Sequence, residues 1–229
     1  MKSDYTDINI IQDKSGSMWP LRNETIGGFN TFIEDQRKTP GCCTITLTQF
    51  NTEFRIVHKG VDVSSVPPLT PETYSPGGMT ALLDAIAKTI QETGARLEAM
   101  PEADRPARVI VVVTTDGEEN SSREFSGTDG RSKVMAMIKE QTERYNWQFI
   151  FLGANQDAIQ AGGSVGVRSA NAMSAGVTGQ AIKSSYAAVS GNIANYRCAA
   201  PSDVDKLAFT KKQREDQLKQ GAAKDALNS

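Results

Sequence analysis

Five consecutive branched aliphatic residues, Val109 to Val113, lead into Thr114, Thr115 and Asp116. A run this apolar has no polar face, so as a strand it must be covered on both sides, as strands of parallel sheets in α/β proteins are. The run is also far too short to span a bilayer. It therefore predicts a sheet with helices on both faces, with Asp116 at the carboxyl end of a buried strand.

The rest of the chain predicts alternating strands and helices. Strands are expected over residues 7–12, 42–50, 53–59, 109–115 and 147–152. Helices are expected over residues 21–38, 80–100, 132–145 and 179–196, and a region rich in Gly, Ala and Ser precedes the last of them. Only Asn51 and Thr52 separate the second and third strands, which favours an antiparallel hairpin. This order predicts a Rossmann-like, doubly wound α/β fold, with a mostly parallel central sheet, one antiparallel edge strand and helices on both faces.

The composition of the chain changes near residue 200. Residues 1–200 contain the alternating elements and are expected to form one domain. Residues 201–229 are polar, alternate in charge and contain few apolar anchors. We therefore expect a charged C-terminal tail that is helical or disordered. A segment that docks on a partner is the other interpretation of this tail.

Charge and composition exclude several classes of protein. The formal net charge of −2 provides no basic field to attract nucleic acid or an anionic membrane. Asp4 and Asp7 interrupt the apolar stretch that a secretion signal needs, and no lipid-attachment motif is present. We therefore expect a cytoplasmic protein that binds neither nucleic acid nor membrane. The three cysteines fit that compartment as reduced thiols, and the neighbours Cys42 and Cys43 should face opposite sides of a strand.

Polar side chains gather at three points where the predicted sheet should bind ligands. Asp13, Ser15 and Ser17 follow the first strand, Thr80 opens a helix behind a Gly-Gly turn, and Asp116 follows the aliphatic strand. Because the carboxyl ends of parallel strands meet at one edge of a sheet, these segments are expected to converge. The spacing DxSxS alone is a weak signal. The convergence of three segments makes the prediction specific.

These side chains suit a hard divalent cation. Two serine hydroxyls, one threonine hydroxyl and two carboxylates are all oxygen ligands, which favour Mg²⁺, with Mn²⁺ or Ca²⁺ as alternatives, over zinc or copper. Because hydroxyls are neutral, a cation held by them keeps much of its charge and can accept one more anionic ligand. An acidic side chain of a partner protein is the expected one. Taken singly, the same residues are also explained as helix caps and turn residues.

The segments IIQDKSGSM, GGMTALLDAI and VVVTTDGEEN resemble, in this order, the three stretches that form the metal-ion-dependent adhesion site (MIDAS) of von Willebrand factor type A (VWA) domains. The resemblance covers about residues 5–197. It implies a Rossmann-like sheet and Mg²⁺-assisted protein binding. It also implies that the hydroxyl residues bind the metal directly, while the two aspartates act partly through water. The implied metal ligands are Asp13, Ser15, Ser17, Thr80 and Asp116.

The function that the resemblance implies is a metal-dependent protein-binding module whose cation coordinates an Asp or Glu of a partner. Relatives inside cells often act in multiprotein complexes beside an ATPase. The chain contains no GxxxxGK[ST] segment, so any such ATPase would be a separate protein. We expect a bacterial or phage protein of this kind, and not an enzyme.

Two other functions are compatible with the same residues. In a Mg²⁺-dependent phosphotransfer or phosphatase enzyme, Asp13 would be a nucleophile at a strand end. Ser15 stands where a second aspartate would then be expected, and the only histidine, His58, lies on the predicted hairpin. The third possibility is a structural subunit whose metal site is unused.

Three residues close to the motif each have two interpretations. Glu118 and Glu119 either tune the metal site and repel an acidic ligand, or belong to a solvated loop. Trp19 is either an exposed aromatic anchor for a partner or a residue buried under the first helix. Only the tertiary structure distinguishes these alternatives.

Overall fold

A computed structural model describes residues 1–154, 157–176 and 178–222. Within them, six strands form one sheet in the order β3-β2-β1-β4-β5-β6. The strands are β1 (Lys2–Asp13), β2 (Cys42–Phe50), β3 (Phe54–Asp62), β4 (Pro106–Thr115), β5 (Gln148–Ala154) and β6 (Ala172–Ala175). β2 and β3 run antiparallel, and all other neighbouring strands run parallel. The predicted mostly parallel sheet with one antiparallel edge strand is confirmed.

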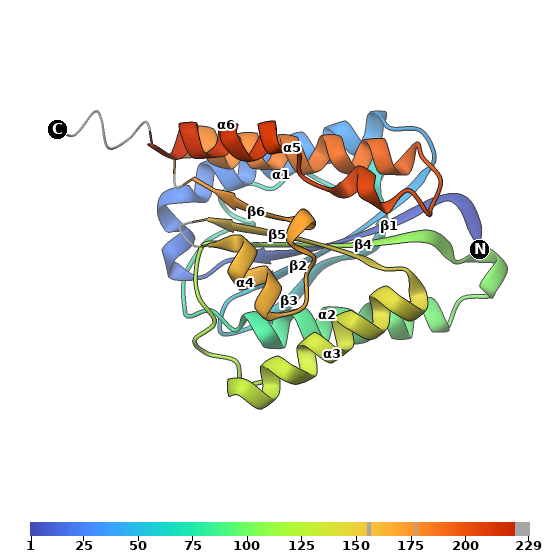
Figure 1. The fold of residues 1–229 in the computed structure, drawn as a ribbon, viewed down its shortest axis with the longest axis horizontal. Coiled ribbons are helices and arrows are strands. Elements are labelled where there is room, and N and C mark those ends of the chain that lie inside the picture. Colours follow the sequence, from blue (N-terminus) through green and yellow to red (C-terminus); the bar gives the residue numbers. More distant parts are fainter. Residues whose placement is uncertain (155–156, 177, 223–229) are drawn as a thin grey trace.

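Helices cover both faces of this sheet (Figure 1). They are α1 (Arg22–Lys38), α2 (Leu82–Glu98), α3 (Gly127–Tyr145), α4 (Ala158–Ser164), α5 (Gly179–Arg197) and α6 (Lys211–Ala222). α1, α5 and α6 lie on one face, and α2, α3 and α4 lie on the other. Among the residues described, no helix combines the length and the apolar character that crossing a bilayer requires.

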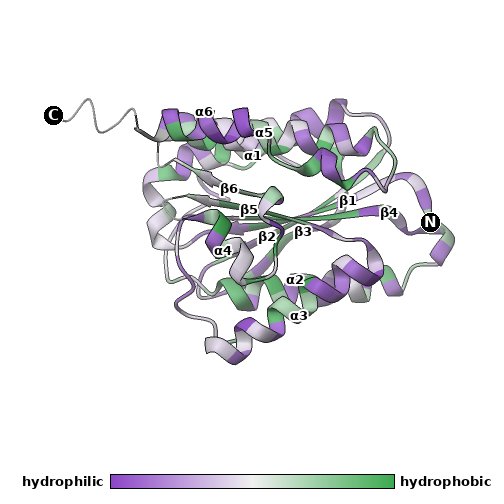
Figure 2. Cartoon of the chain, in the orientation of Figure 1, coloured by the Kyte–Doolittle hydropathy of each residue, from purple (hydrophilic) through white to green (hydrophobic). Residues whose placement is uncertain are grey.

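The aliphatic run of β4 shows why the sheet needs two helical layers. Ile110 and Val112 belong to the core beneath α1 and α5, whereas Val109, Val111 and Val113 belong to the core beneath α2 and α3. None of these side chains is more than 5% exposed. Figure 2 shows hydrophobic residues on the central strands and hydrophilic residues on the helices around them. Removing such side chains from water is the main driving force for this fold.

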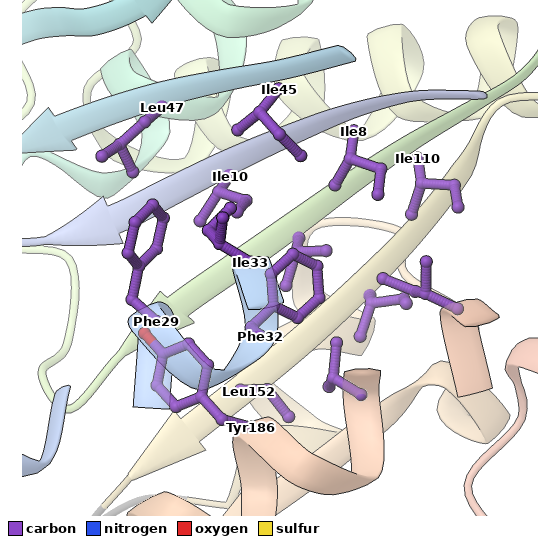
Figure 3. Close-up of a cluster of buried hydrophobic side chains, with 14 of the residues drawn as sticks. Ile8, Ile10, Phe29, Phe32, Ile33, Ile45, Leu47, Ile110, Leu152 and Tyr186 are labelled. Atoms are coloured by element: carbon purple, nitrogen blue, oxygen red, sulfur yellow. The ribbon is translucent and has the colours of Figure 1, made fainter. Parts of the chain in front are cut away.

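α1 packs on the sheet through the apolar face that its sequence predicts. Phe29, Phe32 and Ile33 recur at helical spacing and are at most 3% exposed. Figure 3 shows them in one cluster with Tyr186 of α5 and with side chains from the strands. A Cβ atom on Gly28 would lie 2.4 Å from a ring carbon of Tyr186. The absence of a side chain at Gly28 therefore allows α1 and α5 to pack closely.

Parts of the fold lie outside the elements predicted from hydrophobic patterns. β1 begins at Lys2, before its expected start at residue 7, because its first residues pair with neighbouring strands while Lys2, Ser3 and Asp4 stay exposed. α4 and β6 lie in the region rich in Gly, Ala and Ser, where the sequence predicts no helix or strand. β6 is four residues long and consists of Ala, Met and Ser. Neither its length nor its residue types mark it as a strand.

Residues beyond position 200 pack against the sheet layer as far as α6. Leu207 and Phe209 are 0% and 6% exposed and lie in the core beneath α1 and α5. Phe209 also donates its backbone amide to the carbonyl of Ala170 at 2.9 Å. The charged segment that follows forms α6, which lies along α5 (Figure 1). The division of the chain at residue 200 stays a prediction, and residues 223–229 lie outside the described part.

The cysteines differ in exposure and therefore in expected reactivity. Cys42 and Cys198 are exposed, whereas Cys43 is buried. Burial raises the pKa of the Cys43 thiol to about 12, and the thiolate is the reactive form. We expect Ellman's reagent at mildly alkaline pH to label the two exposed thiols of the native chain rapidly, and to label Cys43 only after unfolding in guanidinium. Rapid labelling of all the thiols in the native chain would contradict this prediction.

Candidate metal-binding site

The carboxyl ends of β1 and β4 lie side by side and bring two of the predicted aspartates together. β1 pairs in parallel with β4 as far as Gln12 and Thr114. Asp13 ends β1, and Asp116 follows the last residue of β4. Asp13 is 0% exposed and Asp116 is 8% exposed. This edge of the sheet therefore carries two largely buried carboxyl groups.

Backbone hydrogen bonds draw the loop before α2 to the same edge. Gly16 donates its amide to the carbonyl of Gly78 at 2.9 Å, and Asn120 donates its amide to the carbonyl of Thr80 at 3.0 Å. α2 begins at Leu82, so Thr80 lies just before the helix that was expected to start with it. The loops on either side, and not the helix itself, position Thr80.

The hydroxyl and carboxylate oxygens at this edge form a row. Ser15 Oγ and Ser17 Oγ are 3.0 Å apart, and Ser17 Oγ donates a hydrogen bond to Asp116 Oδ1 at 2.7 Å. A Cβ atom on Gly117 would lie 3.3 Å from Thr80 Oγ1 and 3.6 Å from Ser17 Oγ. The hydroxyls of Thr80 and Ser17 therefore border the same small space beside Gly117. The structure brings these four predicted ligands together.

Asp13 lies beneath this row and holds it in place. Its Oδ1 accepts a hydrogen bond from the backbone amide of Ser15 at 2.7 Å, and its Oδ2 accepts one from the Thr115 hydroxyl at 2.6 Å. The phenol of Tyr74 donates to the backbone carbonyl of Asp13 at 2.6 Å. The sequence pattern does not predict Thr115 and Tyr74 as supporting residues. The position of Thr115 beside Asp116 was an available signal, whereas nothing in the sequence connects Tyr74 with this edge.

No family model and no curated protein matches this chain, but solved structures do. Proximal thread matrix protein 1 from the mussel byssus is similar over 80% of this chain and 46% of its own, at 14% identity and a TM-score of 0.56. A structure of the same protein with a zinc-occupied MIDAS motif is similar over 90% of this chain and 46% of its own, at 15% identity and a TM-score of 0.50.

A VWA structure from Catenulispora acidiphila is also similar, at 13% identity and a TM-score of 0.49, over 81% of this chain and 42% of that one. The chain has the VWA fold. At these identities the likeness shows the fold alone. The chain spans less than half the length of each of these solved chains.

Within this VWA fold, burial acts against the charged forms of the two site carboxyls. Burial raises the pKa of Asp13, and the neighbouring Asp116 raises it further, although hydrogen bonds from Thr115 and Ser15 lower it. Burial also raises the pKa of Asp116, against a hydrogen bond from Ser17. A cation bound beside these groups would favour their charged forms. The electrostatics of the edge are therefore suited to a positive ligand.

The spacing of the oxygens in this VWA fold fits a small octahedral cation. Ligands about 2.0–2.1 Å from Mg²⁺ stand about 3 Å apart along the edges of an octahedron. The separations from Ser17 Oγ to Ser15 Oγ and to Asp116 Oδ1, 3.0 Å and 2.7 Å, are close to that value. Among the described residues, no group of three or more His, Cys, Asp or Glu side chains is placed to hold a metal ion. A metal site at this edge would therefore depend on hydroxyl ligands.

Glu119, on the loop after β4, turns toward α2. It accepts hydrogen bonds from the backbone amides of Leu83 at 2.9 Å and Ser122 at 2.8 Å, where the N-terminal end of the helix favours negative charge. Asn120 Oδ1 accepts a hydrogen bond from the backbone amide of Thr80 at 2.8 Å. Glu118 stays exposed. Glu119 thus stabilises the loop, and Asn120 is a positioning residue that the sequence pattern does not predict.

Trp19, which follows the DxSxS segment in the chain, is exposed. Its side chain is 56% exposed, and the guanidinium of Arg22 lies 5.1 Å from the centroid of its ring. The interpretation that places Trp19 at the surface is therefore the correct one, and burial under α1 is wrong. Met79, directly before Thr80, is 53% exposed. Met79 thus directly precedes the proposed ligand Thr80, and Trp19 lies two residues after the proposed ligand Ser17.

Proposed function

We propose that this chain is a metal-dependent protein-binding module. In this proposal Ser15, Ser17 and Thr80 bind Mg²⁺ directly, while Asp13 and Asp116 support it, partly through water. The observation that carries the proposal is the row of oxygens at the sheet edge, where Ser17 Oγ lies 3.0 Å from Ser15 Oγ and 2.7 Å from Asp116 Oδ1. Mn²⁺ or Ca²⁺ would use the same donors.

The partner in this proposal supplies an Asp or Glu carboxylate. Hydroxyl ligands leave most of the charge on a divalent cation, and a carboxylate is a hard oxygen ligand matched to that charge. Ser17 is exposed, whereas Asp13 is buried beneath it, so the partner would approach from the side of Ser17. The zinc-occupied MIDAS motif of the mussel byssus protein, which shares this fold, supports a metal site of this kind.

The cellular setting is a further part of the proposal. We place the chain in the cytoplasm of a bacterium or a phage-infected cell, within a multiprotein complex. The sequence contains no GxxxxGK[ST] segment, so an ATPase in that complex would be a separate protein. The proposed binding surface involves neither nucleic acid nor membrane.

The surroundings of Asp13 argue against the alternative of phosphotransfer. A nucleophilic carboxylate must approach its substrate, but both oxygens of Asp13 accept hydrogen bonds and the side chain is 0% exposed. The only histidine, His58, lies on β3 and is separated from β1 by β2. It is therefore not positioned as a general base for this site. A binding module fits the geometry better than an aspartyl-phosphate enzyme.

An affinity experiment tests the proposed function. The tagged chain is incubated with an extract of its source cells in Mg²⁺ and again in EDTA, and the captured proteins are identified by mass spectrometry. Wild-type chain should capture a partner only in Mg²⁺, and Ser15→Ala should reduce that capture at least about tenfold, the effect of losing about 1.4 kcal/mol of binding free energy. Changing the partner's critical Asp or Glu to its amide should have the same effect.

A matched control uses another serine. Ser132 is exposed on α3, and its hydroxyl donates within that helix to the carbonyl of Thr128. Ser132→Ala should therefore capture the partner as the wild type does. Equal capture in Mg²⁺ and in EDTA, or equal capture by the Ser15→Ala and Ser132→Ala proteins, would refute a metal-dependent module.

A further inference from the structure

A pocket of about 280 Å³ lies between α3 and the start of β5. β5 begins at Gln148, which lines the pocket, and it runs parallel to β4. The proposed metal ligands follow the carboxyl ends of β1 and β4, so the pocket lies toward the opposite edge of the sheet. Its volume exceeds the roughly 150 Å³ of a protein cavity that holds benzene. The pocket therefore has room for an aromatic ring with a small substituent.

Large apolar side chains form part of the pocket wall. Trp147 and Phe149 are two residues apart at the start of β5, so their side chains point to the same side of the sheet, and each is 4% exposed. Met135 of α3 also lines the pocket and is 41% exposed. Gly166 lies opposite it with a φ of +96°, and a Cβ atom there would lie 3.2 Å from Met135 Cγ. The absence of a side chain at Gly166 therefore keeps this space open.

Three polar groups of buried wall residues have no hydrogen-bond partner within the described part of the chain. Asn171 is 1% exposed and donates its Nδ2 to the carbonyl of Phe149 at 3.2 Å, but its Oδ1 accepts no hydrogen bond. Gln148 is 4% exposed and uses only its Nε2, which donates to the carbonyl and to Oδ1 of Asn146. The indole N–H of Trp147 is also unpaired. Because a buried polar group without a partner destabilises the fold, two acceptors and one donor in this wall favour a ligand that pairs with them.

The charged residues that line the pocket are paired with opposite charges. Lys139 Nζ lies 4.0 Å from Glu143 Oε1, and both residues belong to α3. Arg168 Nη2 lies 3.2 Å from Asp205 Oδ1. All four side chains are at least 47% exposed, so their charges stay in contact with water at the mouth. With these charges balanced, the mouth provides little attraction for an ionic ligand and favours an uncharged one.

We propose that this pocket binds a small uncharged aromatic molecule that carries a primary amide, or a heteroaromatic edge with the same donors and acceptor. The amide N–H groups would donate to Asn171 Oδ1 and Gln148 Oε1, and the amide oxygen would accept the indole N–H of Trp147. The ring would pack against Met135 and Phe149, as ligands do in pockets with apolar walls and few polar groups. This second site uses no proposed metal ligand, so its occupancy should not depend on Mg²⁺.

Tryptophan fluorescence tests this inference, because the chain contains only two tryptophans. In the Trp19→Phe protein, Trp147 is the only indole, and its emission reports on the pocket. Benzamide is titrated as the probe, with toluene and benzoate as matched probes that lack the amide or carry a charge. Benzamide should give a saturable change in emission that is the same in Mg²⁺ and in EDTA. Toluene and benzoate should bind at least about fivefold more weakly, the effect of losing one hydrogen bond.

Variants in the Trp19→Phe background separate recognition of the amide from filling of the pocket. Asn171→Leu removes the unpaired acceptor and keeps a side chain of similar size, so it should weaken benzamide about fivefold and leave the affinity for toluene unchanged. Thr142 lines the pocket, and Thr142→Phe should fill it and abolish the response to both probes. Thr128 is exposed on α3 outside the pocket. Thr128→Phe should therefore bind benzamide as the parent protein does.

The outcomes of this titration are independent of those for the metal site. No saturable response to benzamide, or equal affinities for benzamide and toluene, would overturn the inference and leave the metal-dependent module intact. Benzamide binding that is unchanged in a folded Asn171→Leu or Thr142→Phe protein would also overturn it. Loss of Mg²⁺-dependent partner capture, with benzamide binding retained, would instead refute only the proposed function. Circular dichroism melts of each variant establish that it is folded before titration.

Discussion

Saturating Mg²⁺ is expected to raise the Tm of the wild-type chain by about 5–10 °C, and Asp13→Ala is expected to abolish that increase. A ligand at a hundred times its Kd stabilises the native state by about 2.7 kcal/mol, and each kcal/mol shifts the Tm of a chain this long by about 2–4 °C. Asp13→Ala removes a buried charge and the acceptor that orients the Ser15 backbone and the Thr115 hydroxyl. Thermal melts in Mg²⁺ and in EDTA measure the change in Tm for the wild-type and the Asp13→Ala proteins.

Two further variants show whether the effect is local. Asp129→Ala removes an exposed carboxylate on α3 that pairs with Lys133, and it should keep the full Mg²⁺-dependent increase. Thr115→Val removes the hydroxyl that donates to Asp13 but removes no proposed ligand. The Thr115→Val protein should therefore show only part of the Mg²⁺-dependent increase in Tm. Equal increases in the wild-type and Asp13→Ala proteins would contradict the proposed metal site.

Asp7→Ala is expected to lower the free energy of unfolding by about 3–5 kcal/mol, the usual cost of leaving one partner of a buried ion pair alone. Asp7 on β1 is 0% exposed, and its Oδ2 lies 2.6 Å from a guanidinium nitrogen of Arg96 on α2, whose side chain is 17% exposed. Asn9 and Thr44 also donate to this carboxylate, at 2.9 Å and 2.7 Å. Urea denaturation at an unchanged m-value measures the loss.

An exposed ion pair provides the control for Asp7. Lys59 on β3 and Glu92 on α2 are 2.8 Å apart, with side chains 52% and 50% exposed. Because water solvates both groups, Lys59→Ala should cost at most about 1 kcal/mol. The double variant Asp7→Ala/Arg96→Ala should lose less stability than the sum of its single changes, since the two groups interact. Comparable losses of unfolding free energy for Asp7→Ala and Lys59→Ala would show that burial does not determine how much these ion pairs contribute to stability.

Hydrophobic patterns predict the architecture of this chain well wherever an element has a repeating apolar face. The aliphatic run of β4 requires cover on both sides, and α1 repeats its apolar residues at helical spacing. β6 was missed because its four residues, Ala172 to Ala175, have no such pattern. Its strand conformation depends on parallel pairing with β5, which is a long-range contact.

The residues that support the candidate site also depend on long-range contacts, which local sequence patterns do not reveal. Asp13, Ser15 and Ser17 lie close together in the chain, and the expected convergence of their segment with those of Thr80 and Asp116 makes them candidates. Thr115 and Asn120 act on Asp13 and Thr80, which are far away in sequence, through single hydrogen bonds of 2.6 Å and 2.8 Å. Local propensity carries no information about such contacts, because each depends on the register of two separate segments.

The alternation of strands and helices and the set of oxygen donors follow from the order and type of the residues, because hydrophobic periodicity and ligand chemistry are local properties. The tertiary structure alone decides that Asp13 is buried beneath the hydroxyls, that Glu119 turns toward α2, and that Trp19 is exposed. Each of these outcomes depends on which distant segment occupies the neighbouring space. Packing between β1, β4 and the loop before α2 therefore decides how the predicted ligands are placed relative to one another.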